Sequence, residues 1–383
     1  MSFIINTQFI SKLIISNQIR NTISKKSCNV ENMFLSRFKR YFLFAAIILS
    51  FVLIFINEFF IYSLYRLSWS SIRCKKVDCT KILLVSDPQI LGETFDTNIY
   101  SGIAIVDSDK YLKETFDRAY AFAKPDVICF LGDLMDEGSV AADDAYQRYL
   151  RRFNSIFKTS ANVKHFYIPG DNDIGGERHD YVTVFKRKRF NKSFNETNSI
   201  SIGKRLRILN INLLTHIYPD LNVTDTSSSK LLNIVATHIS VLSYPGITMK
   251  TIMDQFKPNI IFSGHSHLSA VVTYPPQNIQ NLVDNRIVNV EMNNLNVVEI
   301  VVPTSSYRMG VTNIGYGYAV IDDDVMQYTV LWSPDRFKCL WLYVIWLGVL
   351  FLMPLMWLIY RNCSIFHRRV TYRLRLMIAT DKF

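Results

Sequence analysis

The 383-residue sequence is poor in cysteine and has no internal repeat and no low-complexity linker. Its six cysteines are not spaced as a disulfide framework, which excludes a small fold held together by disulfide bridges. A single bridge among Cys74, Cys79 and Cys339 stays open. The length is enough for one large domain or two average ones.

The middle of the chain carries no net charge, although the whole sequence carries a net charge of +11. Residues 1–40 carry a net charge of +6 and residues 361–383 one of +5, so the residues between them are neutral overall. A domain that binds nucleic acid would carry its basic excess in the folded part. The sequence therefore predicts no nucleic-acid partner.

Two long apolar runs, residues 41–62 and 340–360, lie next to the basic ends. Each reaches the roughly 20 residues that cross a bilayer as a helix. A cleaved signal peptide fits the first run poorly, because forty residues precede it and it is too long. We therefore predict a transmembrane helix near each end of the chain. By the positive-inside rule, the tails 1–40 and 361–383 are cytosolic and a domain over 75–335 is lumenal, in contact with membrane lipids.

Glycosylation sequons support the lumenal orientation. They begin at Asn191, Asn195 and Asn222, within polar stretches of the middle segment. Four basic residues that follow the first apolar run oppose it: Arg66, Arg73, Lys75 and Lys76. We expect a lumenal domain with glycosylated surface loops.

Short apolar runs separated by helical patterns predict an α/β domain. The runs expected to be buried strands are residues 81–85, 127–131, 165–168, 232–236 and 259–262. Helical spacing of apolar residues predicts helices over 111–123, 140–157 and 249–256. The first two strands and the helix between them form a βαβ unit, which places Asp87 and Asp133 at the same end of adjacent strands.

Other segments complete the expected architecture. Residues 207–214 read as another strand, and residues 297–302 and 316–332 as strands of a second sheet. We expect the charged stretch 178–205 to be an irregular segment without helices or strands. The fold class predicted is two sheets surrounded by helices.

A residue able to bind a metal follows each of the five buried runs. These residues are Asp87, Asp133, Asp171 or Asn172, His238, and the pair His265 and His267. One such residue alone is more often structural, but the loops past the carboxyl ends of parallel strands form a ligand crevice, and five in this order predict a site. Carboxylates mixed with imidazoles favour Mn²⁺, with Zn²⁺ or Fe as alternatives, and six ligands predict two divalent ions.

The order of these motifs resembles the calcineurin-like metallophosphoesterase family over residues 81–322. The motifs are Asp87-x-Gln89, the Gly132–Gly138 segment (Gly-Asp-x-x-Asp-x-Gly), Gly170-Asp-Asn-Asp173, His238, and Gly264-His-x-His267. The resemblance implies a four-layer sandwich and a dinuclear centre that hydrolyses phosphoesters. It places Asp87 and His267 on one metal, His238 and His265 on the other with Asp171, and Asp133 between both.

Two positions depart from the family pattern. Gln89 stands where the family has a histidine, which makes it a further candidate ligand and a weaker one. Asn172 stands where the family has another histidine, and we predict it as the catalytic residue that orients a phosphoryl oxygen or the leaving group. An amide cannot act as a general acid near neutral pH. We also weigh Tyr307 and Arg308 as substrate contacts against a surface role.

The arrangement of a lumenal domain between two membrane helices is similar to that of the phosphodiesterases that remodel glycosylphosphatidylinositol (GPI) anchors. That resemblance implies removal of ethanolamine-phosphate from a mannose of the GPI glycan. It also implies residence in the early secretory pathway, at endoplasmic reticulum exit sites, the ER–Golgi intermediate compartment or the Golgi. Two alternatives stay open: a broader lumenal phosphoesterase of lipid phosphates, and a cargo-sorting membrane protein with impaired catalysis.

Overall fold

The computed structural model describes residues 37, 40–76, 79–94, 99–203, 205–219, 231–292 and 296–380. The chain divides into two compact units. Residues 60–339 contain every strand of the described chain and all the predicted site residues, and residues 1–59 with 340–383 form the other unit. The expected basic tail 1–40 lies outside the described residues except for Arg37 and Arg40.

The first sheet has the strand order β10-β13-β12-β1-β2-β3. Its strands are β1 (Thr80–Val85), β2 (Val127–Leu131), β3 (Lys164–Ile168), β10 (Val288–Glu291), β12 (Ile314–Asp322) and β13 (Val325–Ser333). Strands β1, β2 and β3 are parallel neighbours, which confirms the predicted βαβ unit. The other pairings are antiparallel, so the sheet is mixed.

The second sheet has the strand order β4-β5-β6-β7-β11-β8-β9 and is also mixed. Its strands are β4 (Ser199–Ile202), β5 (Leu206–Asn210), β6 (Leu232–Ala236), β7 (Ile260–Ser263), β8 (Ala270–Tyr274), β9 (Asn278–Asn281) and β11 (Val297–Val301). Strands β5, β6, β7 and β11 run parallel. The carboxyl ends of β6 and β7 therefore lie side by side.

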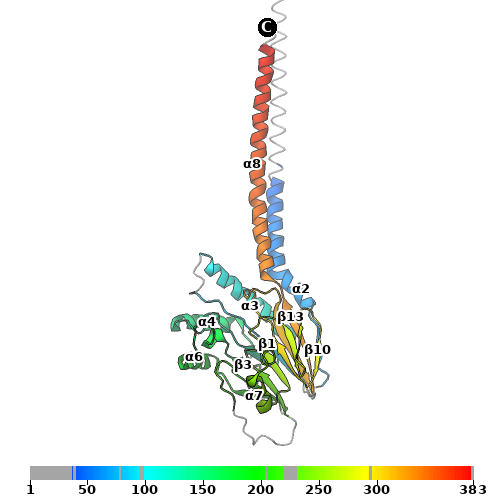
Figure 1. Cartoon of the computed structure of the whole chain (residues 1–383). Helices are drawn as coiled ribbons and strands as arrows, with labels where there is room; N and C mark the ends of the chain where they lie inside the picture. Colours follow the sequence, from blue (N-terminus) through cyan, green and yellow to red (C-terminus); the bar gives the residue numbers. More distant parts are fainter. Residues whose placement is uncertain are drawn as a thin grey trace, which may run out of the picture. The chain divides into compact units, whose positions relative to one another are not determined.

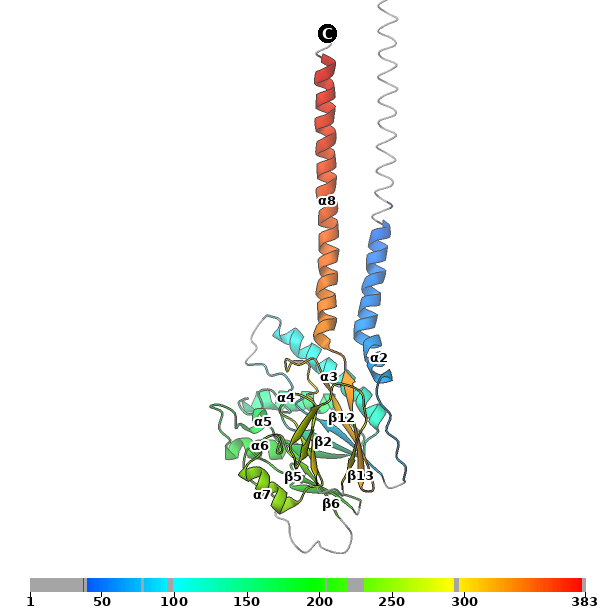
Figure 2. The same ribbon diagram turned by 45° about the vertical axis from the view of Figure 1, so that its right-hand side comes forward.

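In the described part of the chain, three large apolar cores and one small one hold the two sheets and their helices together. The main helices are α3 (Ser101–Ala123), α4 (Asp143–Ile156), α6 (Val184–Phe194) and α7 (Ile247–Phe256), with the single turn α5 (Asp171–Ile174) (Figure 1). One core joins α3 and α4 to the first sheet, for example Phe116 against Tyr316 and Phe153 against Phe130. A second core lies between the sheets, and a third joins α7 to the second sheet. Figure 2 shows the same elements from another side.

Two predictions about this architecture were wrong. Strands β12 and β13 extend the first sheet beside β1 instead of building the second one. The sequence could not assign them to a sheet, because β12 is buried on both faces and its apolar pattern fits either sheet. The stretch 178–205 is not irregular, since it contains α6 and β4. Helix α6 keeps one apolar edge, Phe190 and Phe194, in the first core, and its Arg189 lies over the ring of Tyr146.

The remaining polypeptide features agree with the sequence in outline. Cys74 and Cys79 form a disulfide, which settles the pairing left open. Asn191 and Asn195 are exposed, but Asn191 lies within helix α6 and Asn195 directly after it, not in the surface loops expected. Asn222 lies outside the described residues.

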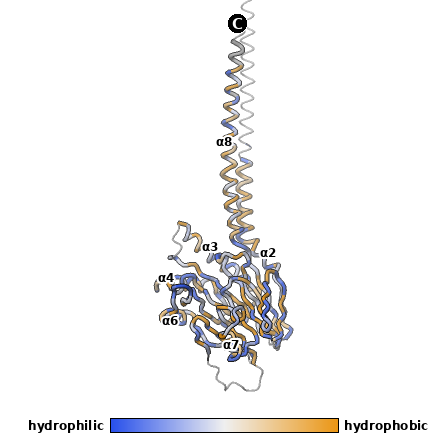
Figure 3. The backbone as a smooth tube through the Cα atoms, viewed as in Figure 1, coloured by the Kyte–Doolittle hydropathy of each residue, from blue (hydrophilic) through white to orange (hydrophobic). Residues whose placement is uncertain are grey.

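Two helices are long and apolar enough to cross a membrane, by length and composition: Arg40–Leu67 and Arg336–Leu374. The first includes a π-helical segment (Ile56–Phe60) before α2 (Ile61–Leu67), and the second is part of α8 (Arg336–Thr380). Figure 3 shows apolar residues along α8 after the domain and more polar ones further on. Within the helical unit, Tyr343 donates a hydrogen bond to Glu58 at 2.8 Å.

Candidate metal centre

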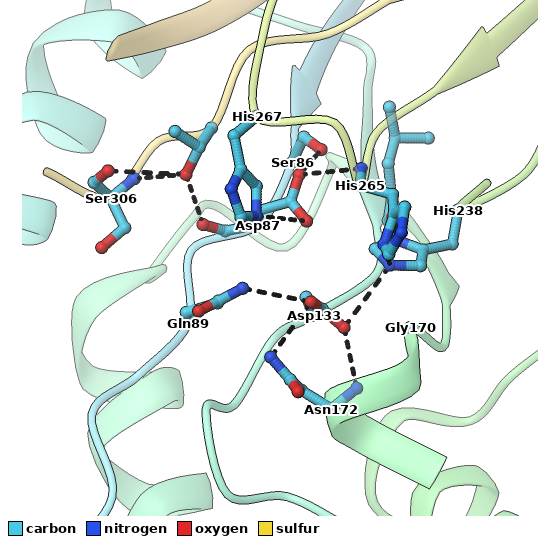
Figure 4. Close-up of polar contacts among 12 residues, drawn as sticks. Ser86, Asp87, Gln89, Asp133, Gly170, Asn172, His238, His265, His267 and Ser306 are labelled. Carbon is cyan, nitrogen blue, oxygen red and sulfur yellow. Dashed lines mark hydrogen bonds and ion pairs between the residues drawn. The ribbon is translucent and has the colours of Figure 1, made fainter. Parts of the chain in front are cut away.

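The five predicted loops come together at the carboxyl ends of β1, β2, β3, β6 and β7 (Figure 4). Several side chains in these loops stand on backbone that non-glycine residues rarely adopt. They have positive φ angles of 46° at Asp87, 41° at Gln89, 52° at Asp133, 64° at His265 and 61° at His267. Such conformations persist only where the surroundings enforce them, and they concentrate at functional sites.

The first ligand group consists of Asp171, His238 and His265. The Oδ1 atom of Asp171 lies 2.9 Å from Nε2 of His238 and 3.2 Å from Nδ1 of His265. The other ring nitrogen of His238, Nδ1, lies 2.8 Å from the carbonyl oxygen of Leu131. That contact makes Nδ1 the protonated nitrogen of the neutral ring and leaves Nε2 as an acceptor for a cation.

The second ligand group consists of Asp87, Asp133 and His238. Nε2 of His238 lies 3.5 Å from Oδ1 of Asp133, so this imidazole belongs to both groups. His267 adjoins the second group, with its Nε2 3.8 Å from Oδ1 of Asp87. The structure thus brings all six predicted ligands into one connected cluster.

Asp133 is held by the two residues that depart from the family pattern. Its Oδ2 accepts hydrogen bonds from the side-chain amides of Gln89 and Asn172, each at 3.1 Å. Its Oδ1 accepts one from the backbone N–H of Asn172 at 2.9 Å. Asn172 therefore points at Asp133, while the preceding Asp171 points at the histidines.

Two glycines let the backbone approach the carboxylates. A Cβ atom on Gly170 would lie 2.2 Å from Oδ1 of Asp133, and one on Gly264 would lie 2.1 Å from Oγ of Ser86. The carboxylate of Asp87 accepts hydrogen bonds from the Ser86 hydroxyl and from the backbone N–H of His265. Only glycine fits at either position.

The charges in the cluster favour a bound cation. Burial would lower the pKa of His238, but the negative charge of Asp133 and the hydrogen bond to Asp171 raise it to about 10. Burial and the neighbouring carboxylates Asp171 and Asp87 raise the pKa of Asp133, against the opposing effect of His238. Without a cation, the buried carboxylates thus draw a proton onto the imidazole.

One buried atom supports the fit to a metal directly. Oδ1 of Asp87 is buried and accepts no hydrogen bond within the described chain. A buried carboxylate oxygen without a partner is costly, and a metal ion would satisfy it. Together with the mixed oxygen and nitrogen donors, this atom shows that the residues fit the two divalent ions expected from the sequence.

Sequence reasoning missed several residues that position this centre. Asp173 accepts hydrogen bonds from the backbone N–H groups of Leu134, Met135 and Gly170, and so fixes the loops that carry Asp133 and Asp171. Its place in the motif Gly170–Asp173 was the available signal. Thr304, which donates to the carbonyl oxygen of Asp87, had no sequence signal.

The prediction for Tyr307 was wrong. Its side chain is buried and donates a hydrogen bond to Asp107 at 2.8 Å, in neither a substrate position nor a surface one. From the sequence alone, an aromatic residue that follows a strand can belong to the core or to a binding site. Only the tertiary packing shows which of the two applies.

Comparison with known proteins places the site in a family. The family model described as calcineurin-like phosphoesterase matches residues 80–269, which contain all five loops. Metallophosphoesterase 1 of Xenopus laevis is 31% identical over 166 residues, which cover 40% of this chain and 38% of that protein. The Metallophosphoesterase 1 homolog of Drosophila melanogaster is 28% identical over 141 residues, 35% of each chain. The chain thus spans less than two fifths of these relatives.

Solved structures give more distant matches. A metallophosphoesterase from Sphaerobacter thermophilus is 12% identical, with a TM-score of 0.33 and coverage of 66% of this chain and 88% of that one. GAP50, the anchor in the inner membrane complex of Plasmodium, is 10% identical, with a TM-score of 0.37 and coverage of 67% and 84%. The assignment therefore rests on the family match and on the Asp/His cluster within it. The chain belongs to the calcineurin-like metallophosphoesterases.

Proposed function

We propose that the protein is a dinuclear metal-dependent phosphodiesterase that removes ethanolamine-phosphate from a mannose of GPI anchors and so supports export of GPI-anchored proteins. The observation that carries the chemistry is the pair of carboxylate–imidazole groups that share His238. The substrate rests on the resemblance of the sequence to the GPI-remodelling phosphodiesterases. The match to Metallophosphoesterase 1 over part of the chain supports it.

Two sets of residues would hold the ions. Asp87 and His267, with Gln89 as a further candidate, would hold one, and Asp171, His238 and His265 the other. Asp133 would lie between them. Two divalent cations, when bound, activate a water molecule and neutralise charge on the phosphoryl oxygens. Mn²⁺ suits this donor set best, with Zn²⁺ or Fe as alternatives.

Asn172 is the proposed catalytic residue. Its backbone N–H and its side-chain amide lie beside Asp133 at the centre, so the amide is within reach of a phosphoryl oxygen or the leaving oxygen. A donor fixed there stabilises charge that develops in the transition state. Because an amide does not release a proton near neutral pH, the leaving oxygen must take its proton from water.

Membrane anchoring fits a lipid-anchored substrate. The two apolar helices, if both span the membrane, confine the domain to the surface that carries the substrate and raise its effective concentration. We place the domain on the lumenal side in the early secretory pathway. Membrane lipids and the GPI-anchored substrate are its proposed partners.

Two other functions follow from specific observations. The donor set itself shows no preference for a glycan, which favours a broader phosphoesterase of lipid phosphates. Gln89 and Asn172 replace two family histidines, which favours a cargo-sorting protein with impaired catalysis. The three functions differ in what the protein hydrolyses.

The test uses the purified full chain in nanodiscs, loaded with Mn²⁺. We expect hydrolysis of a GPI glycan that carries the ethanolamine-phosphate branch and none of the glycan without it. Equal rates on unrelated lipid phosphates would indicate the broader enzyme, and bound metal without hydrolysis of an aryl phosphodiester the sorting protein. Asp133→Asn should lose both metal, measured by mass spectrometry, and activity by on the order of a hundredfold or more. Asp254→Asn, on the exposed side of α7, is the matched control.

A further inference from the structure

The start of helix α3 leaves apolar side chains exposed. Ile103 is 75% exposed and Val106 67%, and Ile99, just before the helix, is fully exposed. Ile103 and Val106 are three positions apart and so share one face of the helix, and Ile99 lies in the turn just before it. Tyr100, also exposed, precedes the helix beside them. We call Ile99, Ile103 and Val106 the α3 stripe.

The same face of α3 becomes charged after the stripe. Lys110, Lys113 and Asp117 continue it at the same helical spacing and are exposed. The opposite face is buried in the first core through Leu112 and Phe116. Lys113 pairs with Asp117 at 2.9 Å. An apolar stripe followed by charged residues on one face of an otherwise packed helix is the pattern of an interfacial helix.

The stripe lies next to the points where the domain continues into the two apolar helices. Asp107, the residue after Val106, accepts a hydrogen bond from Nε of Arg336 at 3.1 Å, and Arg336 is the first residue of α8. One turn further, the Tyr111 hydroxyl donates to the carbonyl oxygen of Pro334 at 2.8 Å. The Tyr111 ring lies 6.2 Å from that of Tyr62 in α2.

Both chain junctions therefore contact α3 within about one and a half turns of Val106. Figure 2 shows α2 and α3 at the same edge of the domain. Leu340, where the apolar run begins, lies four positions after Arg336. Four residues of chain span at most about 14 Å, so a short tether joins the part of the domain that contacts α3 to that run.

We propose that the α3 stripe docks the domain on the lipid surface and thereby sets the height of the metal centre above it. This inference rests on the membrane anchoring proposed above. Behind the stripe, Ala104 and Ile105 line a cavity of about 280 Å³ whose far wall includes Leu91 and Glu137. Those two residues belong to the loops that follow Asp87 and Asp133, so α3 and the loops of the metal site line the same cavity. The substrate class that suits this arrangement is a phosphodiester on a lipid-anchored carrier.

A depth measurement tests the docking without any reference to activity. A fluorophore is attached at Ile103→Cys or at Ile247→Cys in the full chain, with Cys28 and Cys363 replaced by serine. Ile247 is 88% exposed on α7, which covers the other sheet, and is the matched control. In nanodiscs with brominated lipids, we expect emission at position 103 to fall and emission at position 247 to stay constant. Equal emission at the two positions would overturn the proposal. A cross-link between positions 103 of two chains, without quenching, would overturn it too, because it would show that a second copy of the chain covers the stripe.

An activity measurement then tests the consequence. The double substitution Ile103→Asp with Val106→Asp should lower hydrolysis of a lipid phosphodiester in nanodiscs by about tenfold or more, the factor that corresponds to about 1.4 kcal/mol of lost lipid contact. Hydrolysis of a soluble aryl phosphodiester should not change, and Ile247→Asp should change neither rate. An unchanged rate on the lipid substrate would contradict the proposal. If the protein hydrolyses neither substrate, the proposed function fails, and the depth measurement still decides the docking.

Discussion

Asn172 contacts both carboxylate oxygens of Asp133. Its backbone N–H donates to Oδ1 at 2.9 Å, and its side-chain amide donates to Oδ2 at 3.1 Å. The preceding residue, Asp171, turns instead toward His238 and His265. The sequence left either residue open as the ligand, and the geometry separates them: Asp171 lies among the imidazoles, and Asn172 supports the central carboxylate.

Substitution of these two neighbours should therefore have different effects. Asn172→Ala keeps the backbone hydrogen bond and removes only the amide donor, so we expect kcat to fall by about a hundredfold with metal content unchanged. Asp171→Ala should release metal, because it removes the carboxylate that joins His238 and His265. Metal content by mass spectrometry and single-substrate kinetics distinguish the two. Metal loss in Asn172→Ala would make Asn172 the ligand and contradict this division.

The site was predictable where local sequence determines it. Short apolar runs that end at a glycine or a polar residue predicted the strands that precede Asp87, Asp133 and His238. The parallel order of β1 and β2 followed from the helix between them. Parallel strands deliver their following loops to one edge. That rule was enough to place Asp87 and Asp133 together, whereas His238 follows β6 of the other sheet and reaches them only through the packing of the two sheets.

The other features of the fold and the site depend on contacts between segments that are far apart in the chain. Such contacts cannot be predicted from the local sequence pattern. Strand β12 has an apolar pattern that fits either sheet, and only its pairing with β1 decides. Tyr307 is held by Asp107, 200 positions away. The left-handed backbone at His265 and His267 likewise follows from surroundings that close around them, since local propensity disfavours it.

Gln89 should make the two proposed metal positions differ in affinity. Its amide lies 3.1 Å from Asp133, at the position where the family has a histidine. Gln89→His would supply an imidazole to the ion held by Asp87, so we expect that ion to bind about ten- to a hundredfold more tightly, as measured by titration of the metal-free protein. Gln89→Ala should weaken the same ion. Equal affinities in all three proteins would show that position 89 contributes nothing to metal binding.

Gly170 sets the distance between two site loops. A methyl group there would overlap Oδ1 and the backbone nitrogen of Asp133, at 2.2 and 2.3 Å. Gly170→Ala should lower the free energy of unfolding by about 1–3 kcal/mol and reduce metal content, because the Asp133 loop must move. Gly246→Ala is the matched control, since its methyl group meets no atom within 4 Å and its φ of 178° suits any residue. Equal melting temperatures for the two variants would exclude the close approach.

His165 should make the stability of the domain fall in mild acid. Its ring lies between the hydroxyls of Thr159 and Tyr167, each at 2.8 Å, and burial lowers its pKa below the ordinary value of 6.5. Below pH 6.5 the unfolded chain therefore binds a proton that the folded domain does not, and the free energy of unfolding falls as pH decreases toward the lowered pKa. His165→Gln removes this titration, so its melting temperature should fall less between pH 7 and pH 5, about the range over which histidine titrates. His179→Gln, at an exposed position, should follow the native profile. Identical profiles for His165→Gln and the native protein would show that His165 does not control the acid response.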